Sequence, residues 1–146
     1  MIDLGAHGMY LTEWLLGVPA SAVSTFTVSC SSGGALDKNT DKVEDNAVTV
    51  MRYDNGAIAI NETGFVSDCS PVVLEVHGEY GYVRMENDRV VKSTRATNHS
   101  TVEVETPTSK PSPIKQFLAG DVLPGCSIKE AKALTQMMVM AYSRVM

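Results

Sequence analysis

The spacing of hydrophobic residues divides the chain into an initial helical segment, a run of strand-like segments and two final helical segments. Residues 3–16 predict a helix, because Gly17 follows their last apolar residue and Pro19 comes two residues later, a combination that stops helices. Beyond this point apolar and polar residues alternate with the period of two that is typical of strands. Strands are predicted at residues 22–30, 47–53, 57–63, 71–77, 81–85, 89–93 and 101–105.

Turn and cap residues mark the ends of these segments. Asn55-Gly56 lies between two predicted strands and indicates a tight hairpin, because this pair tolerates the positive φ of such a turn. Pro113 suits the first position of a short helix, and Ser127 with Glu130 has the spacing of a capping box. The apolar face predicted for the last helix is formed by Ala131, Leu134, Met138 and Ala141, with Met137, Val139 and Tyr142 beside them. The order of a helix, strands and then helices predicts an α+β fold: an open, mainly antiparallel sheet with helices packed on one face.

Two glycines lie inside the first predicted helix. Gly5 and Gly8 each weaken a helix by about 1 kcal/mol relative to alanine. A helix that keeps such residues usually has another segment packed closely against it. We therefore expect close packing against this helix.

Composition narrows the class of protein. With 146 residues, 44% of them hydrophobic and 20% charged, the chain has the composition of one globular domain. Lys and Arg number 12 against 17 Asp and Glu, and the net charge of −5 disfavours a nucleic-acid partner. The apolar runs are far shorter than the ~20 residues that span a bilayer. The cysteines Cys30, Cys69 and Cys126 form no C-x-x-C pair, and no secretory signal opens the chain, so we expect a cytoplasmic protein.

The best candidate for catalysis is His7, because Asp3 lies four residues before it. Residues at this spacing share a helix face, so the Asp3 carboxylate could orient the imidazole or hold a substrate hydroxyl. An imidazole can take up a proton near neutral pH, which suits the deprotonation of an alcohol. The alternative is that Asp3 only caps the helix and His7 is a surface or core histidine.

Other chemistry has little support in the sequence. His77 and His99 have no carboxylate or cysteine at a metal-ligand spacing, so we expect structural or solvated roles for them and no metal site. The eleven glycines include no G-x-G pair, which excludes the G-x-G-x-x-G loop that binds dinucleotide phosphates. We therefore assign no cofactor-binding residue.

Residues 1–17 (MIDLGAHGMYLTEWLLG) resemble the start of the C-terminal domain of the glucose–fructose oxidoreductase/inositol dehydrogenase (Gfo/Idh/MocA) family, whose members carry D-x-G-x-H before a helix. Later segments resemble that domain in the same order. They are residues 43–46 leading through Asn55-Gly56 into residues 58–62, the strand and G-x-x-G turn of residues 74–81, and the last helix with Tyr142-Ser143-Arg144 near its end.

This resemblance implies a two-domain, NAD(P)-dependent dehydrogenase acting on a sugar, a polyol or a related hydroxy compound. It assigns the acid/base role to His7 and the orienting or hydroxyl-binding carboxylate to Asp3. Members often carry an aspartate where Tyr10 stands, which places Tyr10 at a substrate-binding position and leaves the substrate class open. Residues 1–146 would be the substrate and oligomerisation domain, and Met1 would be a start inside a larger protein.

The family's N-terminal domain, with its glycine loop and E-K-P lysine, has no counterpart in this sequence. We therefore expect NAD or NADP to bind only in the full-length protein, and this chain alone to have neither activity nor bound cofactor. The alternative function is a non-catalytic dimerisation or binding module, because the family's open sheet face commonly forms the subunit interface. On that basis we expect a homo-oligomer formed through the sheet face. A free-standing α+β ligand-binding fold has less support.

Overall fold

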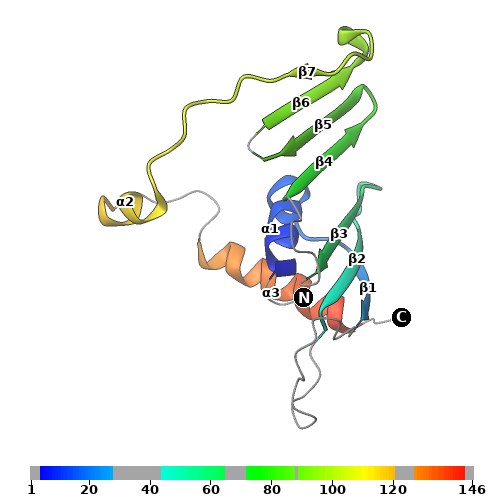
Figure 1. The fold of residues 1–146 in the computed structure, drawn as a ribbon. Coiled ribbons are helices and arrows are strands. Elements are labelled where there is room, and N and C mark those ends of the chain that lie inside the picture. The colour runs from blue at the N-terminus through cyan, green and yellow to red at the C-terminus, as the bar shows by residue number, and fades with distance from the viewer. Residues whose placement is uncertain (1–3, 28–43, 65–71, 88, 121–126, 144–146) are drawn as a thin grey trace, which may run out of the picture. The chain divides into compact units, whose positions relative to one another are not determined.

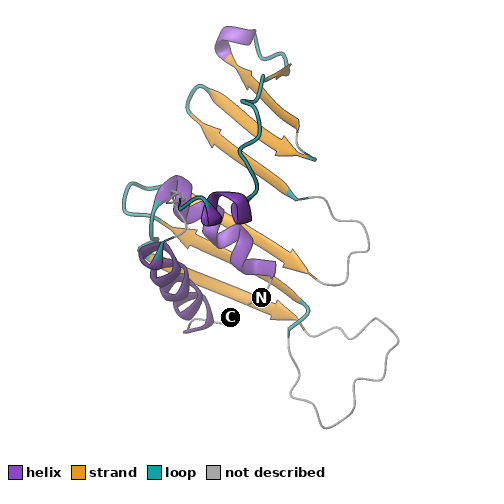
Figure 2. Ribbon diagram, turned by 90° about the vertical axis from the view of Figure 1, so that its left-hand side faces the viewer, coloured by secondary structure: helices purple, strands orange, loops and turns teal. Residues whose placement is uncertain are grey.

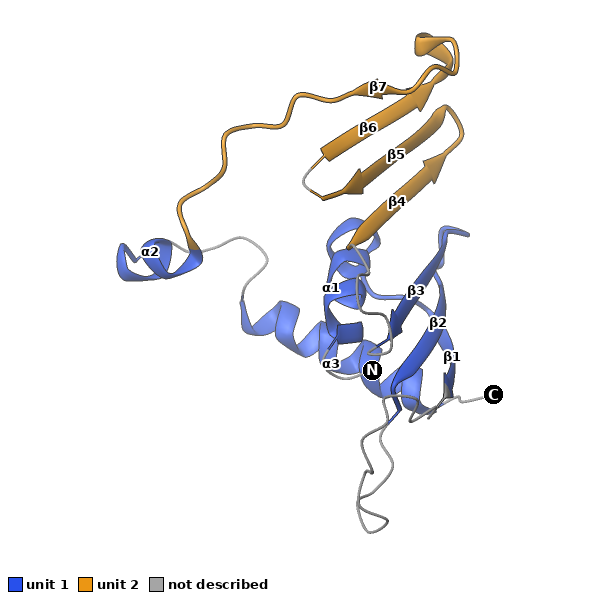
Figure 3. Ribbon diagram, viewed as in Figure 1, with its two compact units in different colours: residues 1–68, 113–146 blue, residues 69–112 orange. Residues whose placement is uncertain are grey.

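The computed structural model describes residues 4–27, 44–64, 72–87, 89–120 and 127–143. The chain divides into two compact units, residues 1–68 with 113–146 (unit 1) and residues 69–112 (unit 2) (Figure 3). The cysteines, the predicted loop after the first strand and Asp3 lie outside the described residues.

Unit 1 is a three-stranded antiparallel sheet covered on one face by helices (Figures 1 and 2). Strands β1 (Ser21–Thr27), β2 (Asn46–Arg52) and β3 (Ile58–Gly64) lie in that order across the sheet. Helix α1 (Leu4–Leu16) packs on β3, and α3 (Ile128–Ser143) packs on β1 and beside α1. The short helix α2 (Pro113–Leu118) begins at the predicted proline and has exposed apolar side chains.

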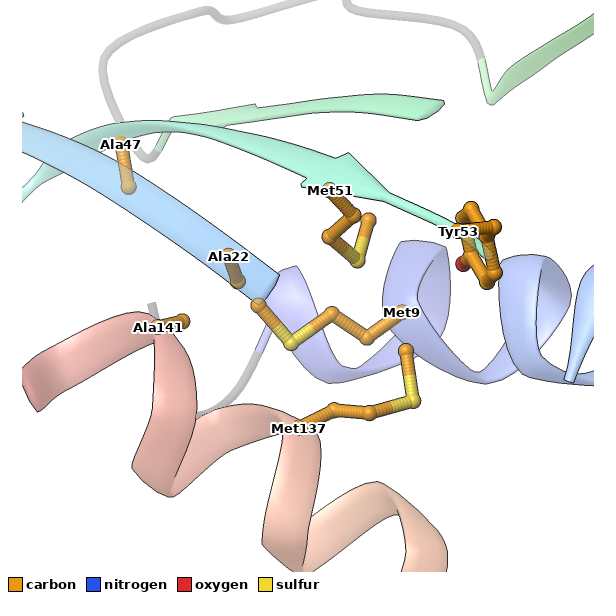
Figure 4. Packing of buried hydrophobic residues seen from close by; sticks show 7 residues of the cluster. All are labelled: Met9, Ala22, Ala47, Met51, Tyr53, Met137 and Ala141. Carbon is orange, nitrogen blue, oxygen red and sulfur yellow. The ribbon is translucent and has the colours of Figure 1, made fainter. Parts of the chain in front are cut away.

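The core of unit 1 lies between this sheet and the two long helices. Met9 from α1, Met51 from β2 and Met137 from α3 point into this space and are almost completely buried (Figure 4). Ala22, Ala47 and Ala141 leave room for the helices to approach the strands, and flexible methionine side chains fill what remains. One face of the sheet is therefore fixed against α1 and α3.

Helix α3 begins with the predicted capping box. The Ser127 amide donates to the Glu130 carboxylate at 3.0 Å, and the Lys129 amide donates to Ser127 Oγ at 3.1 Å. The predicted apolar face, in contrast, is partly wrong, because Ala131 and Val139 are exposed. The fully buried positions are Ala133, Met137 and Ala141. Since they lie four residues apart, they form the narrow stripe that fits between the sheet and α1.

Unit 2 is a four-stranded antiparallel sheet. Its strands are β4 (Val73–Gly78), β5 (Gly81–Glu86), β6 (Arg89–Thr94) and β7 (Val102–Glu103), in that order, with a 3₁₀ turn at Arg95–Thr97. The α+β class and the antiparallel pairing are thus confirmed, and the strands form two separate hydrogen-bonded sheets.

The β2–β3 hairpin is confirmed at the predicted Asn55-Gly56. The Tyr53 amide donates to the Ala57 carbonyl at 3.0 Å across a three-residue loop. Gly56 alone among the loop residues has a positive φ, of 85°, and Asn55 Oδ1 accepts from the Ala57 amide. No helix in the described part of the chain has the length and apolar character to cross a membrane.

Candidate active site on helix α1

The first turns of α1 are held on the sheet by a contact between two glycines and Asn61 of β3. The Asn61 side-chain amide donates to the Gly5 carbonyl at 2.9 Å, and only 8% of Asn61 is exposed. A Cβ placed on Gly8 would lie 1.9 Å from Asn61 Oδ1, so a larger residue cannot occupy this position without displacing Asn61. The close packing predicted from Gly5 and Gly8 is therefore confirmed.

His7 lies between these two glycines on the opposite, exposed side of the helix. Gly5 and Met9 are buried against the sheet and α3, whereas the His7 side chain is exposed. Successive residues of a helix differ by about 100° in direction, which places His7 on the outer side when Gly5 faces inward. The histidine is therefore neither sealed under apolar packing nor part of the core.

The outer side of α1 also carries large apolar side chains. Leu4, Trp14 and Leu15 are exposed, Trp14 to 66%. Near the end of α1, Val18 and residues of α3 line an open, mainly apolar hollow of about 530 Å³. This hollow does not include His7; its lining residues are Val18, Thr135, Gln136, Val139 and Met140.

The other predicted site residues have different outcomes. Tyr10 is half-buried on α1, three residues after His7. Asp3 lies outside the described residues, so the placement of its carboxylate beside His7 stays a prediction. His77 Nε2 lies 2.7 Å from Glu75 Oε1 on the surface of unit 2, and His99 is exposed after the 3₁₀ turn. Among the described residues, no three His, Cys, Asp or Glu side chains gather where they could hold a metal ion.

The sequence did not point to the polar residues between α1 and the sheet. Thr12 Oγ1 donates to the Met9 carbonyl at 2.8 Å, and the Tyr53 hydroxyl is buried without a hydrogen-bond partner among the described residues. Burial raises the pKa of the Tyr53 phenol, and the nearby Glu13 carboxylate raises it further. Asn61 belongs to the same group. The glycine pair signalled a close neighbour, but no sequence signal identified Asn61 as that neighbour.

Comparison with known proteins identifies the domain. The family model described as the GFO/IDH/MocA C-terminal domain matches residues 1–84, and the chain belongs to this family. A search of curated proteins gave no match.

Solved structures share the fold at low sequence identity. UDP-N-acetylglucosamine 3-dehydrogenase GnnA from Acidithiobacillus ferrooxidans has a TM-score of 0.75 at 17% identity, with 98% of this chain and 46% of that chain covered. A levoglucosan dehydrogenase in complex with NADH and levoglucosan has a TM-score of 0.69 at 14% identity, covering 94% and 46% of the two chains. An oxidoreductase from Agrobacterium radiobacter with NAD+, L-tartaric acid and magnesium has a TM-score of 0.62 at 15% identity, covering 97% and 45%. The chain therefore spans less than half the length of these enzymes.

Proposed function

We propose that residues 1–146 form the C-terminal domain of a two-domain, NAD(P)-dependent oxidoreductase acting on a sugar, a polyol or a related hydroxy compound. In this proposal His7 accepts the alcohol proton, Asp3 orients His7 or the substrate, and Tyr10 contributes to substrate binding. The observation that supports it most directly is the position of His7, exposed on the outer side of α1 while Gly5 and Met9 fix the inner side. Membership of the family supplies the reaction class.

The chemistry assigned to this chain is the transfer of one proton. Oxidation of a secondary alcohol removes a proton from the hydroxyl oxygen and a hydride from the carbinol carbon. A neutral nitrogen of the His7 imidazole takes the hydroxyl proton, and the electron pair of the O–H bond goes into the new carbonyl. A positioned base of this kind typically contributes about 10²–10⁴-fold to the rate.

The glycines of the described residues do not form the phosphate loop that binds a dinucleotide. Gly5 and Gly8 pack on β3, and Gly56 and Gly81 lie in hairpins, so none of these glycines forms a phosphate loop between a strand and a helix. We therefore assign NAD or NADP, which supplies the hydride acceptor when bound, to a second domain. The exposed Leu4, Trp14 and Leu15 support a partner on the outer side of α1, because exposed apolar surface of this kind marks interaction sites.

The decisive experiment is His7→Ala in the two-domain protein. We expect kcat to fall by about 10²–10⁴-fold with the fold retained, because the proton acceptor is lost. His77→Ala is the matched control, since His77 is an exposed histidine of unit 2 that already pairs with Glu75. Near-normal turnover of His7→Ala would exclude the proposed role.

The roles of Asp3 and Tyr10 can be separated by their kinetic effects. If Asp3 orients His7, Asp3→Asn should lower kcat and shift the pH profile of kcat, because the imidazole loses its negative neighbour. If Tyr10 binds substrate, Tyr10→Phe should raise KM with little change in kcat.

The chain alone should not bind NADH, and micromolar affinity in calorimetry would contradict the assignment of the cofactor to another domain.

A second function, assembly of a homo-oligomer through the sheet, is supported by the outer face of unit 1. Ile58 and Ile60 of β3 are 65% and 69% exposed, and Val50 of β2 pairs with Ile60. These side chains form an apolar surface on the face that α1 and α3 do not cover. Such a surface suits a second copy of the chain.

This second function can be tested by the state of association. Ile60→Lys should shift a dimer toward monomer in sedimentation or light scattering, because a charge is placed at the centre of the apolar surface. Ile114→Lys, on the exposed α2, is the matched control. A wild-type chain that stays monomeric at high concentration would contradict assembly without affecting the role of His7.

A further inference from the structure

A row of buried polar side chains crosses the inner face of the unit 1 sheet. Ser24 of β1 pairs in register with Thr49 of β2, and Thr49 pairs with Asn61 of β3. All three are buried, and the Ser24 and Thr49 hydroxyls are hydrogen-bonded at 2.9 Å. Burying a polar group in an apolar core costs free energy unless the group is hydrogen-bonded. Burial alone would therefore favour apolar residues at these three positions.

Asn61 ends this row and contacts the backbone of α1 rather than another side chain. The Gly5 carbonyl has two acceptor sites, one suited to the helix hydrogen bond and the other to the Asn61 amide. The side-chain amide can come this close only because Gly8, one turn along, has no Cβ. Gly5, Gly8 and Asn61 therefore act as one contact.

This contact fixes the part of α1 that carries His7. The other inner residue nearby, Met9, has a flexible apolar side chain, and its packing contacts are not directional. A hydrogen bond to one carbonyl is directional and selects a single position. A slip of one residue would rotate His7 by about 100° and move it by about 1.5 Å along the axis.

We infer that Asn61 is the positioning residue for His7: through its hydrogen bond to the Gly5 carbonyl and its contact with Gly8 it sets the rotation and height of the His7-bearing turn. Asn61 reaches neither the substrate nor the cofactor in this assignment. The catalytic consequence rests on the proposed function, whereas the placement of the turn does not.

The first test measures the placement of α1 without any catalysis. In this chain, Asn61→Ala should speed amide hydrogen exchange in the first two turns of α1 by about tenfold or more and shift the His7 ring resonances, because the turn is no longer held. Glu62→Gln is the matched control, since Glu62 is the exposed neighbour on the same strand. Unchanged exchange and an unchanged His7 signal in Asn61→Ala would overturn the inference.

A double-mutant cycle tests whether Gly8 and Asn61 act together. Gly8→Ala alone should perturb α1, since its Cβ meets Asn61 Oδ1. In the double variant Gly8→Ala/Asn61→Ala that clash is gone, so the added perturbation from Gly8→Ala should largely disappear. Additive effects would contradict the contact. If Asn61→Ala does not fold, Asn61→Leu keeps a side chain of similar shape, removes the hydrogen-bond donor and adds no charge.

The second test uses turnover in the two-domain protein. Asn61→Ala should lower kcat by about 10²-fold with a nearly unchanged KM, because a displacement of about 1 Å at a catalytic group has an effect of this size. Unchanged kcat in Asn61→Ala, alongside a large loss in His7→Ala, would overturn the catalytic part of the inference and leave the proposed function standing. Unchanged turnover in His7→Ala would instead reject the proposed function, while hydrogen exchange would still decide whether Asn61 holds the turn.

Discussion

The two units of the chain keep their strands together in different ways. In unit 1 one face of a three-stranded sheet is buried under α1 and α3, and three methionines are almost completely enclosed. The described residues of unit 2 include no α-helix, and among them only Ser93 is buried. Val76 and Val83, which pair across β4 and β5, are both more than 40% exposed.

Charge pairs take the place of a core on one face of unit 2. Arg84 of β5 lies 2.7 Å from Glu86 and 3.4 Å from Glu75, and Arg89 contacts Glu103 across β6 and β7. Exposed pairs of this kind contribute about 0–1 kcal/mol each. The comparison indicates that the free energy of unfolding is concentrated in unit 1, where the His7-bearing helix is anchored.

The largest expected effect is the loss of a core methionine. Met9→Ala should cost about 2–5 kcal/mol of unfolding free energy, because it removes a buried side chain and leaves a cavity between α1, α3 and the sheet. Val83→Ala in unit 2 should cost about 1 kcal/mol or less, because this side chain is already 43% exposed. Denaturant unfolding monitored by circular dichroism measures both. Equal losses of unfolding free energy would mean that apolar packing stabilises unit 2 as much as unit 1.

Glycines in the hairpins provide the next contrast. Gly56→Ala should cost about 1–2 kcal/mol, because φ is +85° but no atom within 4 Å obstructs a Cβ. Gly81→Ala should cost more, since its φ is +150° and its Cβ would lie 2.0 Å from the Ser93 backbone carbonyl. Hydrogen exchange resolved by residue would show loss of protection in β5 and β6 for Gly81→Ala. A smaller effect at Gly81 than at Gly56 would show that the β6 backbone moves readily to make room for the added Cβ.

Paired polar groups should differ between the units as well. Thr49→Val removes a partner of the buried Ser24 hydroxyl and should cost about 1–3 kcal/mol. The double variant Ser24→Ala/Thr49→Val should lose less than the two single variants combined, because neither hydroxyl is then left behind. The corresponding cycle at Arg89 and Glu103 should give a coupling of about 0–1 kcal/mol. Equal coupling free energies at the two pairs would mean that the buried pair in unit 1 is no stronger than the exposed pair in unit 2.

Local features of the fold could be predicted from the sequence because their causes are local. The end of α1 at Leu16, the capping box at Ser127 and the β2–β3 hairpin each depend on a few neighbouring residues. Gly5 and Gly8 likewise predicted a close contact. Except for that contact, whose partner lies on β3, each signal and the structure it predicts lie within a few residues of each other along the chain.

Features that depend on distant residues could not be predicted in this way. Asn61 meets Gly5 across 56 residues of sequence, and nothing in its own segment marks it as the partner. The pattern of alternation gives strands but does not say which of them share a sheet. In α3, apolar residues occupy so much of the circumference that periodicity did not separate the buried Ala133 from the exposed Ala131. Tertiary packing selects among such alternatives.

The smallest expected effect concerns the Tyr53 hydroxyl, which burial leaves without a partner among the described residues. Tyr53→Phe should change the unfolding free energy at pH 7 by about 1 kcal/mol or less, with stabilisation the expected sign, because an unsatisfied buried group is removed.

Because burial raises the pKa of Tyr53 above its ordinary value of 10.0, the folded state holds the phenolic proton more tightly than the unfolded state. Ionisation of Tyr53 therefore leaves the unfolding free energy unchanged below pH 10 and lowers it as the pH rises from 10 through the raised pKa. Unfolding curves from pH 8 to 11 should show a steeper loss for the wild-type chain than for Tyr53→Phe, with Tyr80→Phe, at an exposed ring of unit 2, as the control. Parallel curves for the wild type and Tyr53→Phe would mean that the hydroxyl reaches water, and the packing between α1 and the sheet would then be looser than that of a closed core.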